Sequence, residues 1–191
     1  MSQLTPQYNF DYVIVGQGIC GTLLSYFLNR EEKKFLVIDE PKPYTASKVA
    51  SGVINPITGR RLVRTWMIED VMPFAVDVYK QLEVELEISF ITQNNIFDFH
   101  PTAQMQLAFD ERLQQESAYL KEVQDNLQWK DYFNYPFGIG EINPCWLINI
   151  NQLLEKNTAY SIGGKQQKWA ILLLNQTTIS NGIARMAPIL S

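Results

Sequence analysis

Three glycines and one acidic residue are spaced so that they could hold a dinucleotide. Residues 16–21 read Gly-Gln-Gly-Ile-Cys-Gly, and Asp39 follows about 20 residues later. In such a loop Gly16 allows a tight turn, Gly18 leaves room for a pyrophosphate, and Gly21 lets a helix pack closely on a strand. A helix beginning there directs its free N–H groups at the phosphates. The carboxylate of Asp39 can accept hydrogen bonds from ribose hydroxyls.

The elements around this loop have the order that a dinucleotide site requires. Residues 11–15 are an apolar, β-branched run, which predicts a strand buried on both faces. Residues 22–29 carry apolar side chains at helical spacing, and residues 35–38 predict a second buried strand that ends at Asp39. A strand, a helix and a strand within about 30 residues form a βαβ unit with a right-handed crossover. The sequence therefore predicts an α/β fold with a parallel sheet.

The βαβ unit alone leaves FAD and NAD open as cofactors. The negative charge of Asp39 argues against NADP, because it would repel a 2′-phosphate. Residues 41–64 form a long connection with three prolines and two glycines, and long loops in compact domains are usually functional. Small residues within 45–56 would let the backbone approach a pyrophosphate and a flavin ring.

The stretch Thr-Ala-Ser-Lys-Val-Ala-Ser-Gly-Val-Ile-Asn-Pro at 45–56 resembles the second flavin-binding stretch of the D-amino-acid oxidase-like family of FAD-dependent oxidoreductases. The resemblance covers about the first 65 residues well and continues more faintly to about residue 155. It implies a Rossmann-like FAD-binding domain with a parallel sheet, plus part of a mixed-sheet α+β substrate domain, and FAD as the cofactor. It also implies the cofactor-binding residues, which are Gly16, Gln17, Gly18, Ile19, Cys20, Gly21, Asp39, Glu40, Ser47, Ser51, Gly52 and Val53. Catalytic residues are not identified.

The resemblance also implies a domain organisation. Residues 1–85 would be the N-terminal part of the FAD-binding domain, and residues 86–191 would be a partial substrate domain. Family members are longer, so the C-terminal half of the family fold, with its last glycine-bearing strand and helix, is expected to be missing here. A half-built domain would leave a sheet edge and apolar surface uncovered, which makes a homo-oligomer one expected outcome.

The function that the resemblance implies is oxidation of the C–N bond of an amine or amino acid by hydride transfer to the flavin. Two alternatives remain open. One is a non-catalytic or truncated dinucleotide-binding fragment, which would keep residues 16–39 without a complete substrate pocket. The other is an NAD-dependent dehydrogenase, against which the loop at 50–56 speaks.

Composition limits the partners that we expect. The net charge is −4, with 16 basic and 20 acidic residues and no basic run, so nucleic-acid binding has no electrostatic support. Two widely separated cysteines predict neither a disulfide framework nor a metal site and fit a reducing, cytoplasmic location. Residues 1–10 lack the apolar core of a signal peptide, and the longest apolar run, 169–174, is too short to span a membrane.

The rest of the chain gives coarser predictions. Helices are predicted at 65–86, with Pro73 as a break or kink, at 101–119 and at 150–156; strands are predicted within 88–100 around an Asn94-Asn95 turn, within 134–149, at 169–174 and within 177–191. His100 is interpreted as a surface-turn residue, Cys20 as a small apolar filler and Cys145 as a structural residue. The aromatic residues at helical spacing are interpreted as core, and they are Trp66, Phe74 and Tyr79. The three arginines that follow the loop are interpreted as a solvated helix entry in preference to an anion site, and they are Arg60, Arg61 and Arg64.

Overall fold

The computed structural model describes residues 9–40, 42–116, 118–123, 128–163 and 169–173. The chain divides into two compact units, one from residues 1–50 and 150–191 and the other from residues 51–149. The first unit is therefore discontinuous in sequence, and the second is inserted into it. The boundary expected at residue 85 falls inside the second of these units, in α3.

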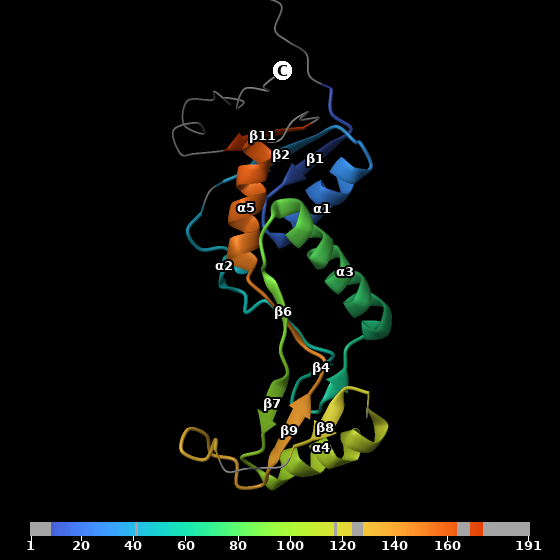
Figure 1. Ribbon diagram of the computed structural model, residues 1–191, viewed down its shortest axis with the longest axis vertical. Helices are drawn as coiled ribbons and strands as arrows, with labels where there is room; N and C mark the ends of the chain where they lie inside the picture. Colours follow the sequence, from blue (N-terminus) through green and yellow to red (C-terminus); the bar gives the residue numbers. More distant parts are fainter. Residues whose placement is uncertain (1–8, 41, 117, 124–127, 164–168, 174–191) are drawn as a thin grey trace, which may run out of the picture. The chain divides into compact units, whose positions relative to one another are not determined.

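The first unit is built on a parallel sheet (Figure 1). Its elements are β1 (Tyr12–Val15), α1 (Ile19–Arg30), β2 (Phe35–Asp39), α2 (Ala46–Val49), α5 (Ile150–Gly163) and β11 (Trp169–Leu173). The strand order is β1-β2-β11, and both neighbours run parallel to β2. The predicted βαβ unit and its parallel pairing are confirmed.

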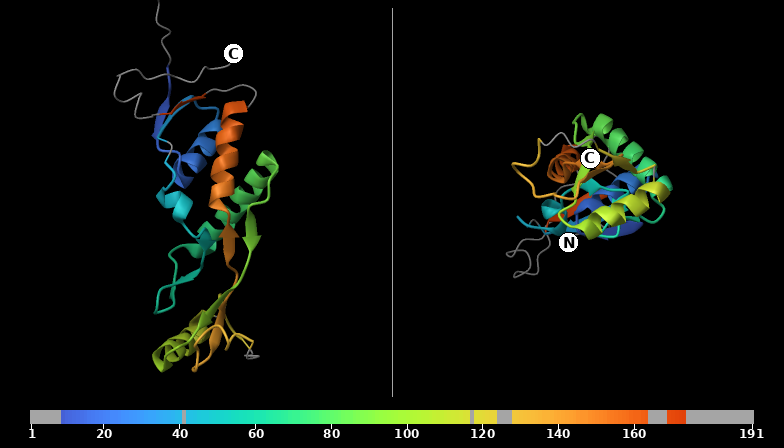
Figure 2. Two further views of the ribbon diagram at one scale, coloured as in Figure 1. Left: turned by 90° about the vertical axis from the view of Figure 1, so that its left-hand side faces the viewer. Right: turned by 90° about the horizontal axis from the view of Figure 1, so that it is seen from below.

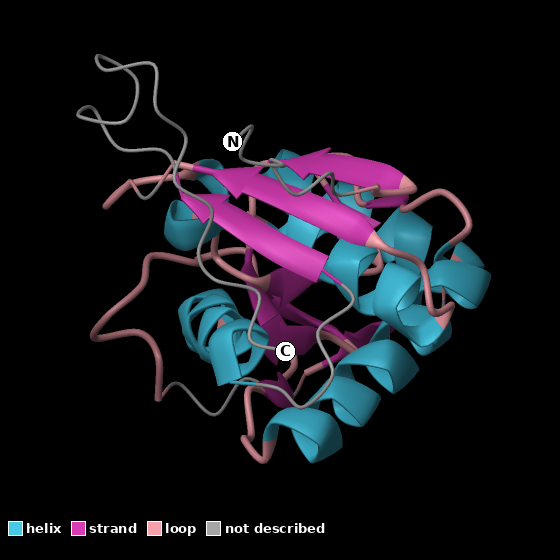
Figure 3. Cartoon of the chain, turned by 90° about the horizontal axis from the view of Figure 1, so that it is seen from above, coloured by secondary structure: helices cyan, strands magenta, loops and turns pink. Residues whose placement is uncertain are grey.

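One face of this sheet carries the core of the first unit. Ile14, Phe35 and Val37 are buried there, and Leu28 of α1 packs against them. On the other face Val13 and Val15 are 57% and 81% exposed. Figure 3 shows this face without a covering helix among the described residues. Burial of β1 on both faces is therefore not found in the described part of the chain, where β1 pairs with β2 and helices cover one face of the sheet.

The described residues of the second unit form small antiparallel sheets and two helices. Its elements are β3 (Val53–Ile54), β4 (Ile57–Thr58), β5 (Val63–Arg64), α3 (Ile68–Leu86), β6 (Ile91–Gln93), β7 (Ile96–Phe99), α4 (Ala103–Gln115), β8 (Leu120–Glu122), β9 (Ile139–Ile142) and β10 (Trp146–Ile148). The sheets have the orders β3-β10-β6, β4-β5 and β7-β9-β8. The strands predicted within 88–100 are confirmed as β6 and β7, but they belong to different sheets. The chain is thus α/β, with both parallel and antiparallel sheets.

Helix α3 corrects the predicted core. It continues through Pro73 as one helix and buries the row that includes Met72, Val76 and Leu82. Tyr79 is buried as predicted, but Trp66 and Phe74 are 82% and 61% exposed. Trp66 precedes the helix, and Phe74 lies two residues after Met72, on the opposite side of the helix.

Helix α4 lies against the β7-β9-β8 sheet (Figure 2). Phe109 of α4 is 2% exposed, and a side chain at Gly140 of β9 would overlap its ring. His100, interpreted as a surface residue, is fully buried and packs against Phe109. The interpretation was wrong because residues 135–138, which are distant in sequence, close over the end of β7 together with α4, which follows His100 directly.

Two other elements differ from expectation or fall outside the description. Helix α5 begins at Ile150 as predicted but continues to Gly163 instead of ending at residue 156. The strand predicted at 169–174 is confirmed as β11, whereas the pair within 177–191 lies outside the described residues. In the part of the chain that the structure describes, no helix combines the length and apolarity needed to cross a bilayer.

Candidate functional site

The glycine loop joins β1 to α1 with the geometry that its residue types predict. Gly16 has a φ of +92°, which favours glycine, and its N–H donates to the Ile38 carbonyl at 2.8 Å. A Cβ on Gly21 would overlap the carbonyl oxygen of Gly16, so α1 packs against the loop more closely than any side chain would allow. A Cβ on Gly18 would lie 2.8 Å from the Ser47 hydroxyl.

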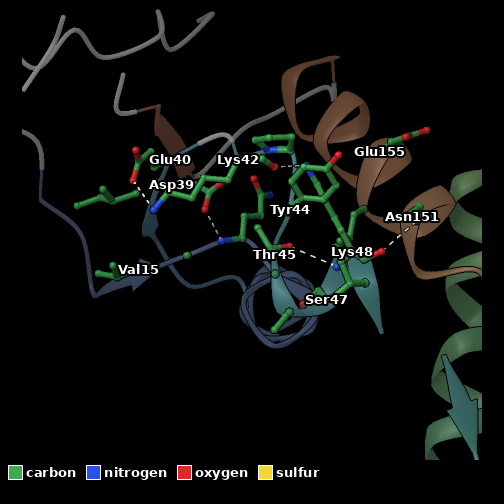
Figure 4. A pocket seen from close by; sticks show the side chains of 18 residues that line it. Val15, Asp39, Glu40, Lys42, Tyr44, Thr45, Ser47, Lys48, Asn151 and Glu155 are labelled. Carbon is green, nitrogen blue, oxygen red and sulfur yellow. Dashed lines mark hydrogen bonds and ion pairs between the residues drawn. The ribbon is translucent and has the colours of Figure 1, made fainter. Parts of the chain in front are cut away.

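Asp39 lies beside this loop because β1 and β2 are parallel and end at the same edge of the sheet. One carboxylate oxygen of Asp39, Oδ1, accepts a hydrogen bond from the Gln17 N–H at 2.9 Å (Figure 4). This bond fixes the orientation of the carboxylate and leaves Oδ2 as a further acceptor. The predicted contact between Asp39 and a ribose stays a prediction. The bond to the loop is a role that sequence reasoning did not assign to this residue.

Ser47 reaches the same loop from α2. The Thr45 hydroxyl caps α2 by accepting from the Lys48 N–H at 3.3 Å. This short helix places the Ser47 Oγ 2.9 Å from the Ile19 N–H, from which it accepts. Gly18, the N-cap of α1, has no side chain to satisfy that group, so Ser47 does so from a distant part of the sequence. The Ser47 hydroxyl proton remains available to donate to a ligand.

The loop, the end of β2 and helices α2 and α5 enclose a cleft of about 1160 Å³ within the first unit (Figure 4). Ligand pockets for drug-sized molecules measure about 300–1,000 Å³, so this cleft has room for a dinucleotide portion. Of the predicted residues, the cleft is lined by Gly16, Gln17, Gly18, Asp39, Glu40 and Ser47. The structure thus places predicted residues from three separate segments at one cleft, and their contacts with a cofactor stay predictions.

Two lysines bring positive charge to the cleft. Lys42 pairs with Glu40 at 2.9 Å, and the Lys48 ammonium donates to the Lys42 carbonyl at 2.6 Å. The Asn151 amide of α5 donates to the Lys48 carbonyl at 3.3 Å, which ties α5 to α2. Sequence reasoning missed these three residues. The lysines lie within the long connection 41–64 and could have been noticed, but no local signal marks Asn151, which follows the inserted unit.

Ser51, Gly52 and Val53 belong to the second unit. Gly52 has a φ of +71°, and a Cβ there would overlap the carbonyl oxygen of Ile148. Val53 pairs with Leu147 of β10. The structure thus gives Gly52 and Val53 roles in the β3-β10 pairing, and their predicted contacts with a flavin stay predictions.

The remaining candidates lie at the surface. Cys20, interpreted as a small apolar filler, is the second residue of α1 and is exposed. Arg60 and Arg61 are exposed in the β4–β5 turn, outside any helix entry. Arg64 pairs with Glu69 at 2.8 Å and with Glu116 at 3.6 Å. Arg60 and Arg61 are therefore solvated, and Arg64 is paired. Because Arg64 lies in β5 and the other two lie in the turn before it, none of them is part of a helix.

The two cysteines should differ sharply toward a thiol reagent. Cys145 is 1% exposed and donates to the Ile142 carbonyl, and burial raises the pKa of its thiol to about 11. Because the thiolate is the reactive form, Cys145 should resist modification at neutral pH, whereas exposed Cys20 should react. A disulfide reagent such as Ellman's should titrate one thiol in the folded chain and a second one after unfolding. Cys20→Ser should remove the fast phase, and rapid reaction of both thiols would contradict the buried position.

Comparisons with known proteins support the fold. No family model matches the sequence, and no curated protein matches it either. Among solved structures, L-amino acid deaminase from Proteus myxofaciens in complex with anthranilate matches with a TM-score of 0.62 at 8% identity, over 83% of this chain and 37% of that one. Glycine oxidase from Bacillus cereus matches with a TM-score of 0.61 at 14% identity, over 79% and 43%.

A third match is L-α-glycerophosphate oxidase from Mycoplasma pneumoniae with FAD bound, with a TM-score of 0.59 at 18% identity, over 87% of this chain and 45% of that one. The chain therefore spans less than half the length of these solved structures. At these identities the likeness shows the fold. It is the fold of the D-amino-acid oxidase-like oxidases, as the resemblance at residues 45–56 implied.

Proposed function

We propose that the first unit binds the ADP portion of FAD and that this chain belongs to an FAD-dependent oxidoreductase. The observation that carries this proposal is the convergence of the glycine loop, Asp39 and Ser47 on one cleft at the carboxyl ends of parallel strands. Ligands in open α/β sheets bind at this edge. One of the solved structures that share this fold has FAD bound.

The residues of the cleft fit the group. Gly18 presents no side chain toward the place where a pyrophosphate would lie, and the N–H groups of Cys20 and Gly21 have no acceptor within α1. The Ser47 hydroxyl proton, together with Lys42 and Lys48, can complete an anion site. Asp39 Oδ2 remains free to accept from a ribose, because Oδ1 is engaged by Gln17.

The reaction that we propose for the whole enzyme is oxidation of the C–N bond of an amine or amino acid. When bound, FAD would supply the hydride acceptor. The described residues of the first unit would bind and orient its ADP portion through backbone N–H groups and the Ser47 hydroxyl. The amino-acid substrate class rests on structural neighbours that are an amino acid deaminase and a glycine oxidase.

A titration with FAD tests this proposal. We expect the chain to bind added FAD, with a change in the visible flavin spectrum, and to bind NAD more weakly. Asp39→Ala should weaken FAD binding by about tenfold or more, because both the loop and the ribose lose an acceptor. Asp11→Ala is the matched control, since Asp11 also accepts a backbone N–H at 2.9 Å, from Lys34, but does not line the cleft.

The outcomes separate the alternatives. FAD binding that is lost in the Asp39 variant and kept in the Asp11 variant would support the proposal. Preferential binding of NAD would favour a dehydrogenase. If the folded chain binds neither nucleotide, the first unit has no cofactor affinity of its own, which would favour the fragment alternative.

A further inference from the structure

Tyr44 is an exposed aromatic residue in the wall of the cleft, on the segment that joins β2 to α2 (Figure 4). It is 81% exposed, and it is the only aromatic residue among the described residues that line the cleft. Within the described part of the chain its side chain makes no hydrogen bond or ring contact. Tyr26 and Tyr79, by contrast, are buried and pack against phenylalanine rings. The ring of Tyr44 is therefore available to a ligand.

The backbone on either side of Tyr44 is held by its neighbours. Pro43 precedes Tyr44, and its pyrrolidine ring fixes its own φ. Thr45 follows as the N-cap of α2, with its hydroxyl accepting from the Lys48 N–H. The Lys48 ammonium also donates to the Lys42 carbonyl at 2.6 Å, which closes a loop around Tyr44. A residue that is held in place before a ligand arrives loses less conformational freedom on binding.

A flat aromatic group is the ligand that an open tyrosine ring favours. The ring has two apolar faces, and aromatic pairs prefer offset-stacked or edge-to-face arrangements. Nucleotide bases stack on aromatic side chains whatever their identity, because every base has a π-face. The sugar and phosphate groups of a nucleotide instead require hydrogen-bonding groups, which Asp39 and Ser47 supply in the same cleft. Tyr44 thus adds the contact for a base that these polar residues lack.

The path of the chain indicates which ring of a dinucleotide lies here. Asp39, to which we assign the ribose, ends β2, and the residues from Glu40 to Tyr44 follow it directly along the cleft wall. The pyrophosphate is assigned to Gly18 and Ser47. In ADP the adenine is joined to the ribose, whereas the flavin of FAD lies beyond the pyrophosphate. Adenine is therefore the ring that we place next to Tyr44.

We propose that Tyr44 binds the adenine ring of the cofactor by stacking. This inference rests on the function proposed above, because it requires the ADP portion to lie in this cleft. Stacking is tolerant of the base, so Tyr44 contributes affinity and does not select adenine over another base. FAD and NAD share the ADP portion, so Tyr44 does not select between them either. Tyr44 is absent from the cofactor-binding residues that the sequence predicted.

Calorimetric titrations of the chain with ADP, FAD and inorganic pyrophosphate test this contact. Tyr44→Ala should weaken the binding of ADP and of FAD by the same factor, about tenfold or more, because both ligands lose the same stacked base. Tyr44→Phe keeps the ring and should bind both nucleotides like the wild type. Pyrophosphate has no ring, so its affinity should be the same for Tyr44→Ala and for the wild type.

Tyr132→Ala is the matched control, because Tyr132 is 77% exposed but belongs to the second unit and does not line the cleft. It should bind both nucleotides like the wild type. If Tyr44→Ala bound ADP normally, or lost pyrophosphate affinity by the same factor, the contact with adenine would be ruled out. These results would leave the proposed function standing. A wild-type chain that binds neither ADP nor FAD would overturn both proposals together.

Discussion

Gly18→Val is expected to abolish FAD binding and leave most of the fold intact. The Cβ would lie 2.8 Å from the Ser47 hydroxyl, and the two methyl groups would extend into the cleft where we place the pyrophosphate. We expect at least about a hundredfold loss of affinity, which corresponds to about 2.7 kcal/mol. Displacing the Ser47 hydroxyl from Ile19 should lower the free energy of unfolding by only about 1 kcal/mol. Titration with FAD and urea denaturation measure the two effects separately.

A double-mutant cycle shows which neighbour of Gly18 matters. In Ser47→Ala the nearest atom to a Cβ at position 18 would be the Cβ of residue 47, at 3.7 Å, an ordinary contact. Gly18→Ala should therefore cost no further stability in the Ser47→Ala background, yet it should still weaken FAD binding. If Ser47→Ala restored FAD affinity to Gly18→Ala, the obstruction would be the hydroxyl, and our placement of the pyrophosphate would be wrong.

Gly52→Ala is expected to destabilise the second unit strongly, even without cofactor. Gly52 has a φ of +71°, and a Cβ would overlap the backbone carbonyl oxygen of Ile148, which cannot rotate away. The Ile148 N–H also donates to the Gly52 carbonyl at 2.8 Å, so this crossing holds β3 beside β10. Left-handed strain and overpacking together predict a loss of about 2–5 kcal/mol in the free energy of unfolding.

Gly59→Ala is the matched control for this prediction. Gly59 has nearly the same backbone conformation, with a φ of +72°, but a Cβ there would meet nothing within 4 Å. It should therefore cost the strain alone, about 1–2 kcal/mol. Urea midpoints and hydrogen exchange of the Ile148 amide would compare the two variants. Equal losses would show that the overlap at Ile148 relaxes, and the role of Gly52 would then be sought at the cofactor.

The sequence predicted those parts of the site that depend on local backbone geometry. The turn at Gly16, the close helix at Gly21 and the position of Asp39 follow from residue types within one βαβ unit, and the structure shows this unit. The long loop was also recognised as part of the site, and Ser47 lies at the cleft. Short-range steric requirements of this kind can be predicted from the sequence, because they demand glycine at particular positions.

Features set by distant segments could not be predicted in this way. Asn151 reaches α2 after the whole second unit has intervened, and the burial of His100 depends in part on residues 137 and 138, far along the sequence. An apolar run such as that of β1 predicts a buried strand, but it does not say which strands and helices will surround it. The exposure of Val13 and Val15 could therefore not be predicted from the sequence. Helical spacing likewise placed Phe74 in the core, because an approximate repeat does not distinguish a helix's inner face from its neighbouring positions.

The discontinuity of the first unit has a consequence for the order in which the chain can fold. Strand β11 extends the sheet by pairing with β2, yet the second unit lies between them in the sequence. Closing so long a loop of unfolded chain carries an entropic penalty that grows with its length. The pairing of Gly52 with Ile148 brings the two ends of the inserted segment together, so a second unit that has already folded acts as a short connection. During synthesis from the N-terminus, β1, α1 and β2 would therefore wait, partly formed, until the inserted unit had folded and β11 had emerged.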